Sequence, residues 1–290
     1  MFYDILHTVQ DGSDSMLTTF LIMVYVISVA LGIYVFDGRI DGVVDNPFVI
    51  ILSILLGFVV TFGVIILFLE STYFFIAKRY PTTSKIKHFV GKQIVSVPMH
   101  LGRIKTTIYG TEHLPQDNRF LIYSNHTSEL DISIIMCQLK EYPVAFLAKQ
   151  AVGSYLSIGK WAEAIGCVML NRENNRQGND AISQVIHRVQ SGSTMVVFPE
   201  GQITREIGGL LKFRRGSFKI ALASGVPIVP ITLVKEPSYY KKKWPQRKRM
   251  DLIIHPPLPF ESFKDVTSKH LAEQVRTIII QGFTSIKKKT

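Results

Sequence analysis

Residues 124–131, SNHTSELD, place a histidine and two acids between two apolar runs. A histidine with a carboxylate partner is a suitable general base near neutral pH, because the acid fixes the imidazole tautomer and stabilises the imidazolium. His126 and Asp131 would lie about 140° apart on a continuous helix, so they meet only if His126 lies in a loop and Asp131 in the first helical turn. The alternative is a capping box in which Ser128 is the N-cap and Asp131 returns the bond. The segment alone does not decide between the two, and both can hold together.

Two further polar segments follow apolar runs that favour strands. In VVFPEGQITR, residues 196–205, Glu200 and Gly201 come directly after such a run. In LNRENNR, residues 170–176, Arg172 stands in the same position. Ligands bind at the ends of strands in α/β sheets, and a guanidinium group there suits a phosphate. An ordinary turn with exposed charges remains the alternative for each segment.

These segments belong to a regular alternation of short apolar runs and helix-like stretches. The alternation predicts an α/β domain with a mixed, largely parallel sheet flanked by helices. The predicted strands are 119–123, 144–148, 165–170, 194–198, 226–233 and 251–255, and the predicted helices are 131–140, 177–190, 215–224 and 266–286.

Two uncharged apolar segments near the start of the chain are long enough to cross a bilayer. Residues 17–36 and 48–69 carry no charged side chain, and about 20 apolar residues span the hydrocarbon core as a helix. Two buried core helices are the alternative, but helices in soluble cores usually show some polar residues over such lengths. The acidic residues before the first segment argue against a secretory signal peptide, whose first region is basic. We therefore expect a transmembrane hairpin within residues 1–77.

Charge is divided unevenly along the chain. Residues 1–77 hold one basic and seven acidic residues, net −6, which leaves 32 basic and 15 acidic residues, net +17, in the remainder of a chain of net charge +11. Lys and Arg stay on the cytoplasmic side of a membrane, so we expect an integral membrane protein whose main domain, residues 106–290, lies on the cytoplasmic face. Residues 78–105 are basic and apolar. We expect them to form an amphipathic interface segment attracted to anionic lipid and interrupted at Pro98.

The two cysteines do not suggest a metal site or a disulfide. Cys137 and Cys167 are each flanked by apolar residues, and a cytoplasmic location argues against a disulfide. No Cys/His cluster has the spacing of a metal site. The sequence therefore predicts buried thiols and no metal.

Several short blocks occur in the order SNHTSELD, LAKQ, GCVMLNR, VVFPEG and VPIVPI. Their order resembles the glycerolipid acyltransferase family, typified by 1-acylglycerol-3-phosphate acyltransferases, over about residues 106–235. The resemblance implies that His126 and Asp131 are the catalytic pair. The substrate-binding residues that it implies are Asn125, Lys149, Arg172, Glu200, Gly201 and Arg205.

The implied reaction moves a fatty acyl group from a thioester donor to the free hydroxyl of lysophosphatidic acid, giving phosphatidic acid. Acyl-CoA or acyl carrier protein would be the co-substrate, and no other cofactor is expected. The family usually continues Phe-Pro-Glu-Gly with Thr-Arg, whereas this chain continues with Gln202 and reaches its arginine at Arg205. This departure concerns the acceptor and not the reaction, and another lysophospholipid or glycerol 3-phosphate remains the alternative acceptor.

A strongly basic segment leaves a second class of function open. KKKWPQRKR, residues 241–249, gathers six cations around Trp244, and tryptophan suits a membrane interface. An acidic acyl donor and a solvated loop are the alternatives to anionic lipid. A non-catalytic scaffold on anionic lipid would use such a segment, but it has no need of a histidine, an aspartate and a glutamate in family blocks. No nucleic-acid motif accompanies the cations, so no nucleic-acid partner is expected.

Overall fold

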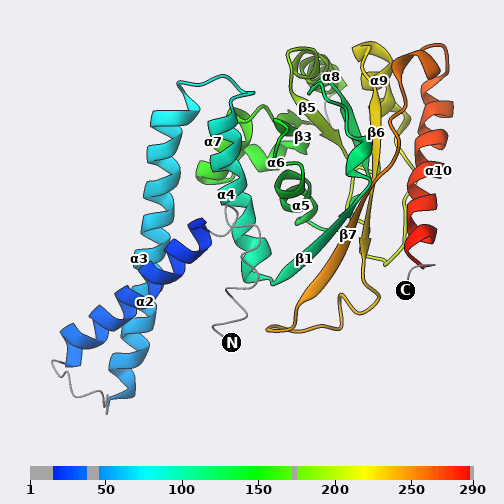
Figure 1. Ribbon diagram of the computed structural model, residues 1–290. Helices are drawn as coiled ribbons and strands as arrows, with labels where there is room; N and C mark the ends of the chain where they lie inside the picture. The colour runs from blue at the N-terminus through cyan, green and yellow to red at the C-terminus, as the bar shows by residue number, and fades with distance from the viewer. Residues whose placement is uncertain (1–15, 38–45, 172–174, 288–290) are drawn as a thin grey trace. The chain divides into compact units, whose positions relative to one another are not determined.

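The computed structural model describes residues 16–37, 46–171 and 175–287. The chain divides into two compact units, Met1–Arg79 and Tyr80–Thr290. The first unit contains the two apolar segments, and the second contains the sheet that is labelled in Figure 1.

The first unit is a pair of helices, α2 (Met16–Asp37) and α3 (Pro47–Thr72), which pack against each other. Gly57 of α3 permits a close approach to α2, because a Cβ at this position would lie 2.6 Å from a methyl carbon of Val29. The α3 helix continues into a π-helical turn, Tyr73–Ala77. Both helices are long and apolar enough to cross a membrane, and most of their large apolar side chains are exposed. Exposed apolar surface of this extent supports association with a membrane.

The second unit is built on a seven-stranded sheet with the order β1-β7-β6-β2-β5-β3-β4. Every neighbouring pair is parallel except β6 and β7, which are antiparallel. The strands are β1 (Ile104–Tyr109), β2 (Leu121–Ser124), β3 (Val144–Lys149), β4 (Val168–Leu170), β5 (Thr194–Val197), β6 (Ile228–Lys235) and β7 (Lys248–Ile254). The mixed, largely parallel sheet expected from the sequence is confirmed.

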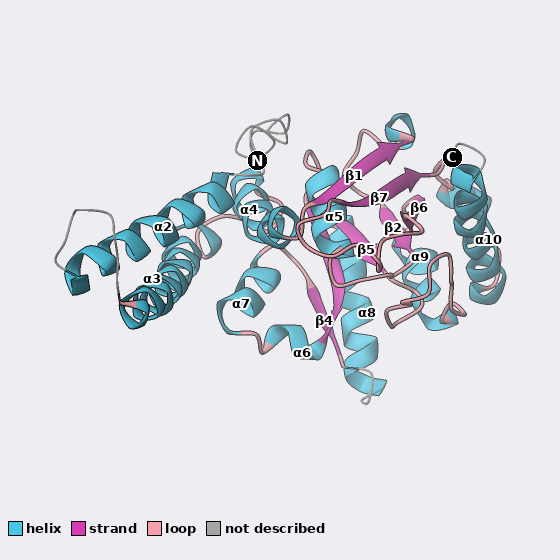
Figure 2. Ribbon diagram, turned by 90° about the horizontal axis from the view of Figure 1, so that it is seen from below, coloured by secondary structure: helices cyan, strands magenta, loops and turns pink. Residues whose placement is uncertain are grey.

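Helices cover both faces of this sheet, as Figure 2 shows, with α4 and α5 on one face and α8, α9 and α10 on the other. The second face holds a buried apolar core in which strand residues such as Leu121 and Tyr123 meet Val185 and Val275 of the helices. The helices of this unit are α4 (Lys85–Leu101), α5 (Asp131–Gln138), α6 (Gln150–Gly153), α7 (Leu156–Ala164), α8 (Asn175–Gln190), α9 (Phe218–Ser224) and α10 (Ser268–Lys287). Single 3-10 turns lie at Thr111–His113, Arg215–Ser217 and Phe260–Ser262.

The direction of the strands determines where a site can form. Strands β6, β2, β5, β3 and β4 all run parallel to one another, so their carboxyl ends meet at one edge of the sheet. Ligands bind at such an edge in α/β folds. The SNHTSELD segment follows β2 and the PEG segment follows β5, which is the neighbouring strand.

The α4 helix departs from what the sequence predicted. It runs through Pro98 without a break, because the proline lies in the last turn, where it removes only one helical hydrogen bond. Two of its three lysines, Lys87 and Lys92, are buried, whereas Lys85 is exposed. Lys87 Nζ donates to the carbonyl of Ala164 at the end of α7, and Lys92 Nζ donates to the carbonyl of Lys140 just beyond α5. A cation at the carboxyl end of a helix is favourable. These two bonds therefore attach α4 to the carboxyl ends of α7 and α5.

Two parts of the domain were missing from the sequence prediction. The β1 strand pairs only with β7 and alternates between half-buried and exposed residues, so it has no continuous apolar run. The α6 and α7 helices are short, and their burial is concentrated at a few residues such as Trp161. Cys137 is buried and Cys167 is half-buried, both as free thiols. Burial raises the pKa of the Cys167 thiol to about 12, which makes it unreactive.

Candidate active site

The core of the site is the pair formed by His126 and Asp131. His126 lies in the loop after β2, and Asp131 is the first residue of α5, which is the arrangement that lets the two side chains meet. His126 Nδ1 lies 2.9 Å from Asp131 Oδ2. The Asp131 side chain is fully buried, and the His126 side chain is 13% exposed. The histidine can therefore contact a substrate while the aspartate cannot.

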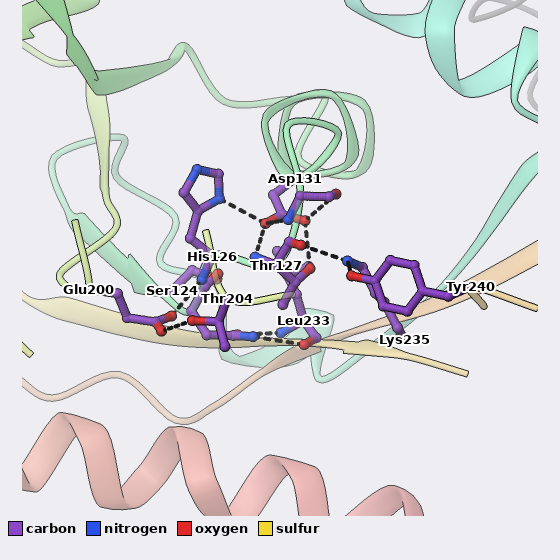
Figure 3. A network of polar contacts seen from close by, with 11 residues as sticks. Ser124, His126, Thr127, Asp131, Glu200, Thr204, Leu233, Lys235 and Tyr240 are labelled. Atoms are coloured by element: carbon purple, nitrogen blue, oxygen red, sulfur yellow. Dashed lines mark hydrogen bonds and ion pairs between the residues drawn. The ribbon is translucent and has the colours of Figure 1, made fainter. Parts of the chain in front are cut away.

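The Asp131 carboxylate is held by its own loop, as Figure 3 shows. It accepts hydrogen bonds from the backbone N–H of Thr127 and, at 2.9 Å, from that of Ser128. The hydroxyls of Thr127 and Ser128 also donate to it, at 3.0 and 3.1 Å. The alternative in which Ser128 is the N-cap is not what the structure shows: the helix begins at Asp131 with Leu130 as its N-cap. Asp131 accepts the hydrogen bonds that the Thr127 and Ser128 groups donate. The same side chain therefore contacts His126 and fixes the loop at the start of α5.

The geometry assigns a proton to one nitrogen of His126. Since Nδ1 faces a carboxylate, Nδ1 carries the hydrogen and Nε2 has a free lone pair. No other group among the described residues hydrogen-bonds to the Nε2 atom. The ring stacks on Phe198, with centroids 4.1 Å apart and planes at 15°. A neutral imidazole with this tautomer and a fixed ring plane can accept a proton from a bound hydroxyl.

Glu200 is buried behind His126 and does not point away from the protein. Its Oε1 accepts a hydrogen bond from the backbone N–H of His126 at 2.8 Å. Its Oε2 accepts from the Thr204 hydroxyl at 2.6 Å and from the Leu211 N–H at 2.8 Å. Thr204 completes the connection, because its N–H donates to the His126 carbonyl at 2.8 Å. These contacts make Glu200 a positioning residue that joins the loop after β5 to the loop after β2, and its predicted contact with substrate stays a prediction.

Gly201 has a clear structural requirement. Its φ is +75°, and a Cβ would lie 2.6 Å from Arg214 Nε. Only glycine combines this backbone conformation with such a close approach. The Arg214 side chain therefore lies directly against the turn that carries Glu200, although the sequence did not single out this arginine.

Asn125 is buried and both ends of its amide are occupied. Its Nδ2 donates to the Leu233 carbonyl at 2.9 Å, and its Oδ1 accepts from the Leu233 N–H at 2.8 Å. The side chain thus pairs with β6 as a backbone peptide would. This contact supports a structural role, and its predicted role in substrate binding stays a prediction.

The other predicted binding residues lie around the edge of the sheet. Lys149 is the last residue of β3 and is exposed. Arg205 is exposed in the loop after β5. Arg172 follows β4 but lies outside the described residues. The structure brings His126, Asp131, Asn125, Glu200 and Gly201 together through hydrogen bonds or chain adjacency.

Sequence reasoning missed Lys235, a buried lysine at the carboxyl end of β6. Its Nζ donates to the Thr127 carbonyl at 2.6 Å, next to the His126–Asp131 pair. Tyr239 lies near Asp131. Its burial, together with the negative charge of Asp131, raises the pKa of Tyr239 to about 12. The available signal was a single lysine that ends the longest buried apolar run, VPIVPITLV.

The sequence is similar to those of known proteins. The Acyltransferase family model matches residues 105–234. The chloroplastic 1-acyl-sn-glycerol-3-phosphate acyltransferase BAT2 of Brassica napus is 34% identical over 151 residues, which cover 52% of this chain and 43% of that protein. The chain therefore spans less than half the length of this plant relative. The 1-acyl-sn-glycerol-3-phosphate acyltransferase alpha of Ovis aries is 30% identical over 192 residues, 64% of this chain and 66% of that protein.

A solved structure shares the fold. The crystal structure of the 1-acyl-sn-glycerophosphate (LPA) acyltransferase PlsC from Thermotoga maritima superposes with a TM-score of 0.59 at 22% identity, covering 77% of this chain and 93% of that one. The resemblance that the sequence blocks predicted is thereby confirmed, and residues 105–234 of this chain form a domain of the Acyltransferase family.

Proposed function

We propose that this chain transfers a fatty acyl group from a thioester donor to the free hydroxyl of lysophosphatidic acid. The observation that carries the proposal is the His126–Asp131 pair, 2.9 Å apart, at the carboxyl edge of the sheet of an acyltransferase domain. The names of the plant and sheep relatives support the choice of acceptor. Acyl-CoA and acyl carrier protein are the two candidate donors.

The reaction needs one base and no covalent enzyme intermediate. His126 Nε2 removes the proton of the acceptor hydroxyl while the hydroxyl oxygen attacks the thioester carbonyl. The C–O bond forms, the C–S bond breaks, and the imidazolium returns the proton to the leaving thiolate. Asp131 holds the tautomer and stabilises the imidazolium during the step. Base catalysis of this kind typically contributes about 10²–10⁴-fold.

Membrane location fits this substrate. Both the acceptor and the product are lipids, and α2 and α3 are long and apolar enough to hold the chain in a bilayer. We propose that the sheet domain lies on the cytoplasmic face, which the basic composition after residue 77 supports. Arg172, which follows β4, is proposed to bind the acceptor phosphate.

A direct assay tests the proposal. The purified full chain in detergent would be given labelled acyl-CoA or acyl carrier protein with a panel of acceptors: lysophosphatidic acid, other lysophospholipids and glycerol 3-phosphate. We expect labelled phosphatidic acid from the wild type and none from His126→Ala. Transfer to a different acceptor in the panel would keep the reaction and replace the substrate. A folded wild type that acylates none of them, or a fully active His126→Ala, would contradict the proposal and favour a lipid-bound scaffold.

A further inference from the structure

Lys235 is a buried cation with no carboxylate partner in the described part of the chain. The residue is 4% exposed, and none of the ion pairs among the described residues involves it. Its Nζ donates to the Thr127 carbonyl and to the Tyr240 hydroxyl, each at 2.6 Å. It also lies over the rings of Tyr239 and Tyr240, 5.0 and 4.7 Å from their centroids. Burial of a charge is costly unless other groups compensate it, and these contacts compensate the burial of the Lys235 cation.

The contact with Thr127 leads directly to the catalytic pair. The carbonyl of Thr127 and the N–H of Ser128 belong to the same peptide group. The carbonyl accepts from Lys235 Nζ at 2.6 Å, and the N–H donates to Asp131 Oδ2 at 2.9 Å. Asp131 Oδ2 is also the atom that faces His126 Nδ1. Figure 3 shows this line of contacts from Lys235 to His126. A cation on the oxygen of a peptide polarises it and strengthens the hydrogen bond that its N–H donates.

We infer that Lys235 is a positioning residue that acts through the 127–128 peptide to keep the His126–Asp131 pair in its unprotonated form. The inference rests on the proposed function only for its catalytic consequence. The pair carries one negative charge when the imidazole is neutral and no net charge after it takes a proton. A nearby cation stabilises the negative form. Lys235 therefore keeps His126 available as a base at a lower pH than the Asp131 carboxylate alone would permit.

Other charged groups around the pair do not replace Lys235 in this role. Glu200 bonds the backbone of His126 and would act in the opposite direction. Glu129 lies in the same loop and is exposed. Glu236 accepts hydrogen bonds from Lys242 Nζ and from the Arg249 N–H. Lys248 lies 5.1 Å from the centroid of the Tyr239 ring. Among the described residues, Lys235 is the cation that hydrogen-bonds the catalytic loop.

The test compares four variants of the full chain in detergent micelles. Lys235→Met removes the cation and the donor, Lys235→Gln keeps a donor without the charge, and Lys235→Arg keeps both. Lys248→Met is the matched control, because it removes a neighbouring cation that touches Tyr239 and not the loop. The first readout is kcat/KM against pH. The second is NMR titration of His126 in protein labelled at histidine Cε1, assigned by the spectrum of His126→Gln.

We expect proton uptake by the pair, and with it the acid limb of the kcat/KM profile, to move to higher pH by about one unit in Lys235→Met and Lys235→Gln. Lys235→Arg and Lys248→Met should keep the wild-type midpoint. An unchanged midpoint in a folded neutral variant would overturn the inference. So would a shifted midpoint in Lys235→Arg, whether or not the neutral variants fold, because that variant keeps the cation and the midpoint would then not depend on the charge.

The two readouts separate this inference from the proposed function. If the wild type acylates no acceptor, the proposed function fails, and the NMR titration of His126 still shows whether Lys235 controls the pair. If the wild type is active and the NMR midpoints of wild type and Lys235→Met agree, the function stands and the role of Lys235 is rejected.

Discussion

At the scale of single residues, the His126–Asp131 pair shows how much a short segment can predict. The contact between His126 and Asp131 was required by their five-residue separation, and the loop-to-helix boundary that permits it is present. The bonds from Thr127 and Ser128 to the same carboxylate could not be read from residue types, since each donor had several possible acceptors. Glu200 was found for its position after a strand, but its three partners depend on the return of the loop at Leu211.

Replacement of Asp131 separates catalysis from helix capping. Asp131→Asn keeps the shape of the side chain but presents an amide where two N–H groups and His126 need acceptors. We expect kcat to fall by about 10²–10⁴-fold as the imidazole loses its tautomer and its counter-charge. Ser128→Ala is the control, because it removes only one hydroxyl bond of 3.1 Å to Asp131. Steady-state kinetics and thermal melts decide: lower stability with normal turnover would mean that Asp131 is only a cap.

Gly201→Ala tests the turn that carries Glu200. The φ of +75° and the 2.6 Å approach to Arg214 Nε oppose any side chain there. A residue strained in this way costs about 1–3 kcal/mol, so the free energy of unfolding should fall by that amount and activity should drop as Glu200 moves. Gly216→Ala is the matched control, since a Cβ at Gly216 meets nothing within 4 Å. Equal stability of the two alanine variants in urea titrations would contradict this account.

At the scale of elements, prediction succeeded where burial makes a strand apolar on both faces. Strands β2, β5 and β6 lie inside the sheet and are almost wholly buried, so they appear in the sequence as continuous apolar runs. The edge strand β1 has neither property. In α4, Lys87 and Lys92 bond carbonyls at the ends of other helices, which depends on packing that a sequence pattern does not contain. The contact of residues 78–105 with lipid stays a prediction.

The α4 helix also predicts a dependence of stability on pH. Burial lowers the pKa of His88 to about 4 from an ordinary value of 6.5. As the pH falls below 6.5 the unfolded chain takes the proton first, so the free energy of unfolding decreases down to pH 4 and is unaffected above 6.5. The loss is about 3 kcal/mol over this range. His88→Gln should remove most of it in denaturant titrations, whereas His187→Gln, at an exposed position, should not. If the free energy of unfolding of His88→Gln falls with pH as steeply as that of the wild type, another group causes the pH dependence.

At the scale of the whole molecule, charge and apolar surface are separated along the chain. The first unit is acidic and apolar, and the second is strongly basic. This division was visible in the sequence, because composition does not depend on the fold. The partners of individual cations were not visible: Lys242 is paired with Glu236 at 2.7 Å, whereas Lys241 and Lys243 are exposed beside Trp244, which is 73% exposed.

This surface gives a prediction about anionic lipid. We expect Lys241→Gln with Lys243→Gln to weaken the stimulation of activity that phosphatidylglycerol gives to the full chain in phosphatidylcholine vesicles. The loss should correspond to roughly 1 kcal/mol per charge at low salt and decrease as salt screens it. Lys242→Gln is the control, because its cation is already neutralised. Unchanged stimulation together with a raised KM for the acyl donor would reassign the two lysines to donor docking.

The pairing of Asn125 with Leu233 has a consequence for chemical ageing of the protein. Hydrolysis of the Asn125 amide would leave a carboxylate whose second oxygen faces the Leu233 carbonyl, where an N–H now donates. The loop that holds His126 would then lose its attachment to β6. The usual route to such damage begins with attack by the backbone nitrogen of the next residue, which is His126. That N–H is bound by Glu200 at 2.8 Å, so the carboxylate that positions the loop after β2 also protects the amide on which this loop depends.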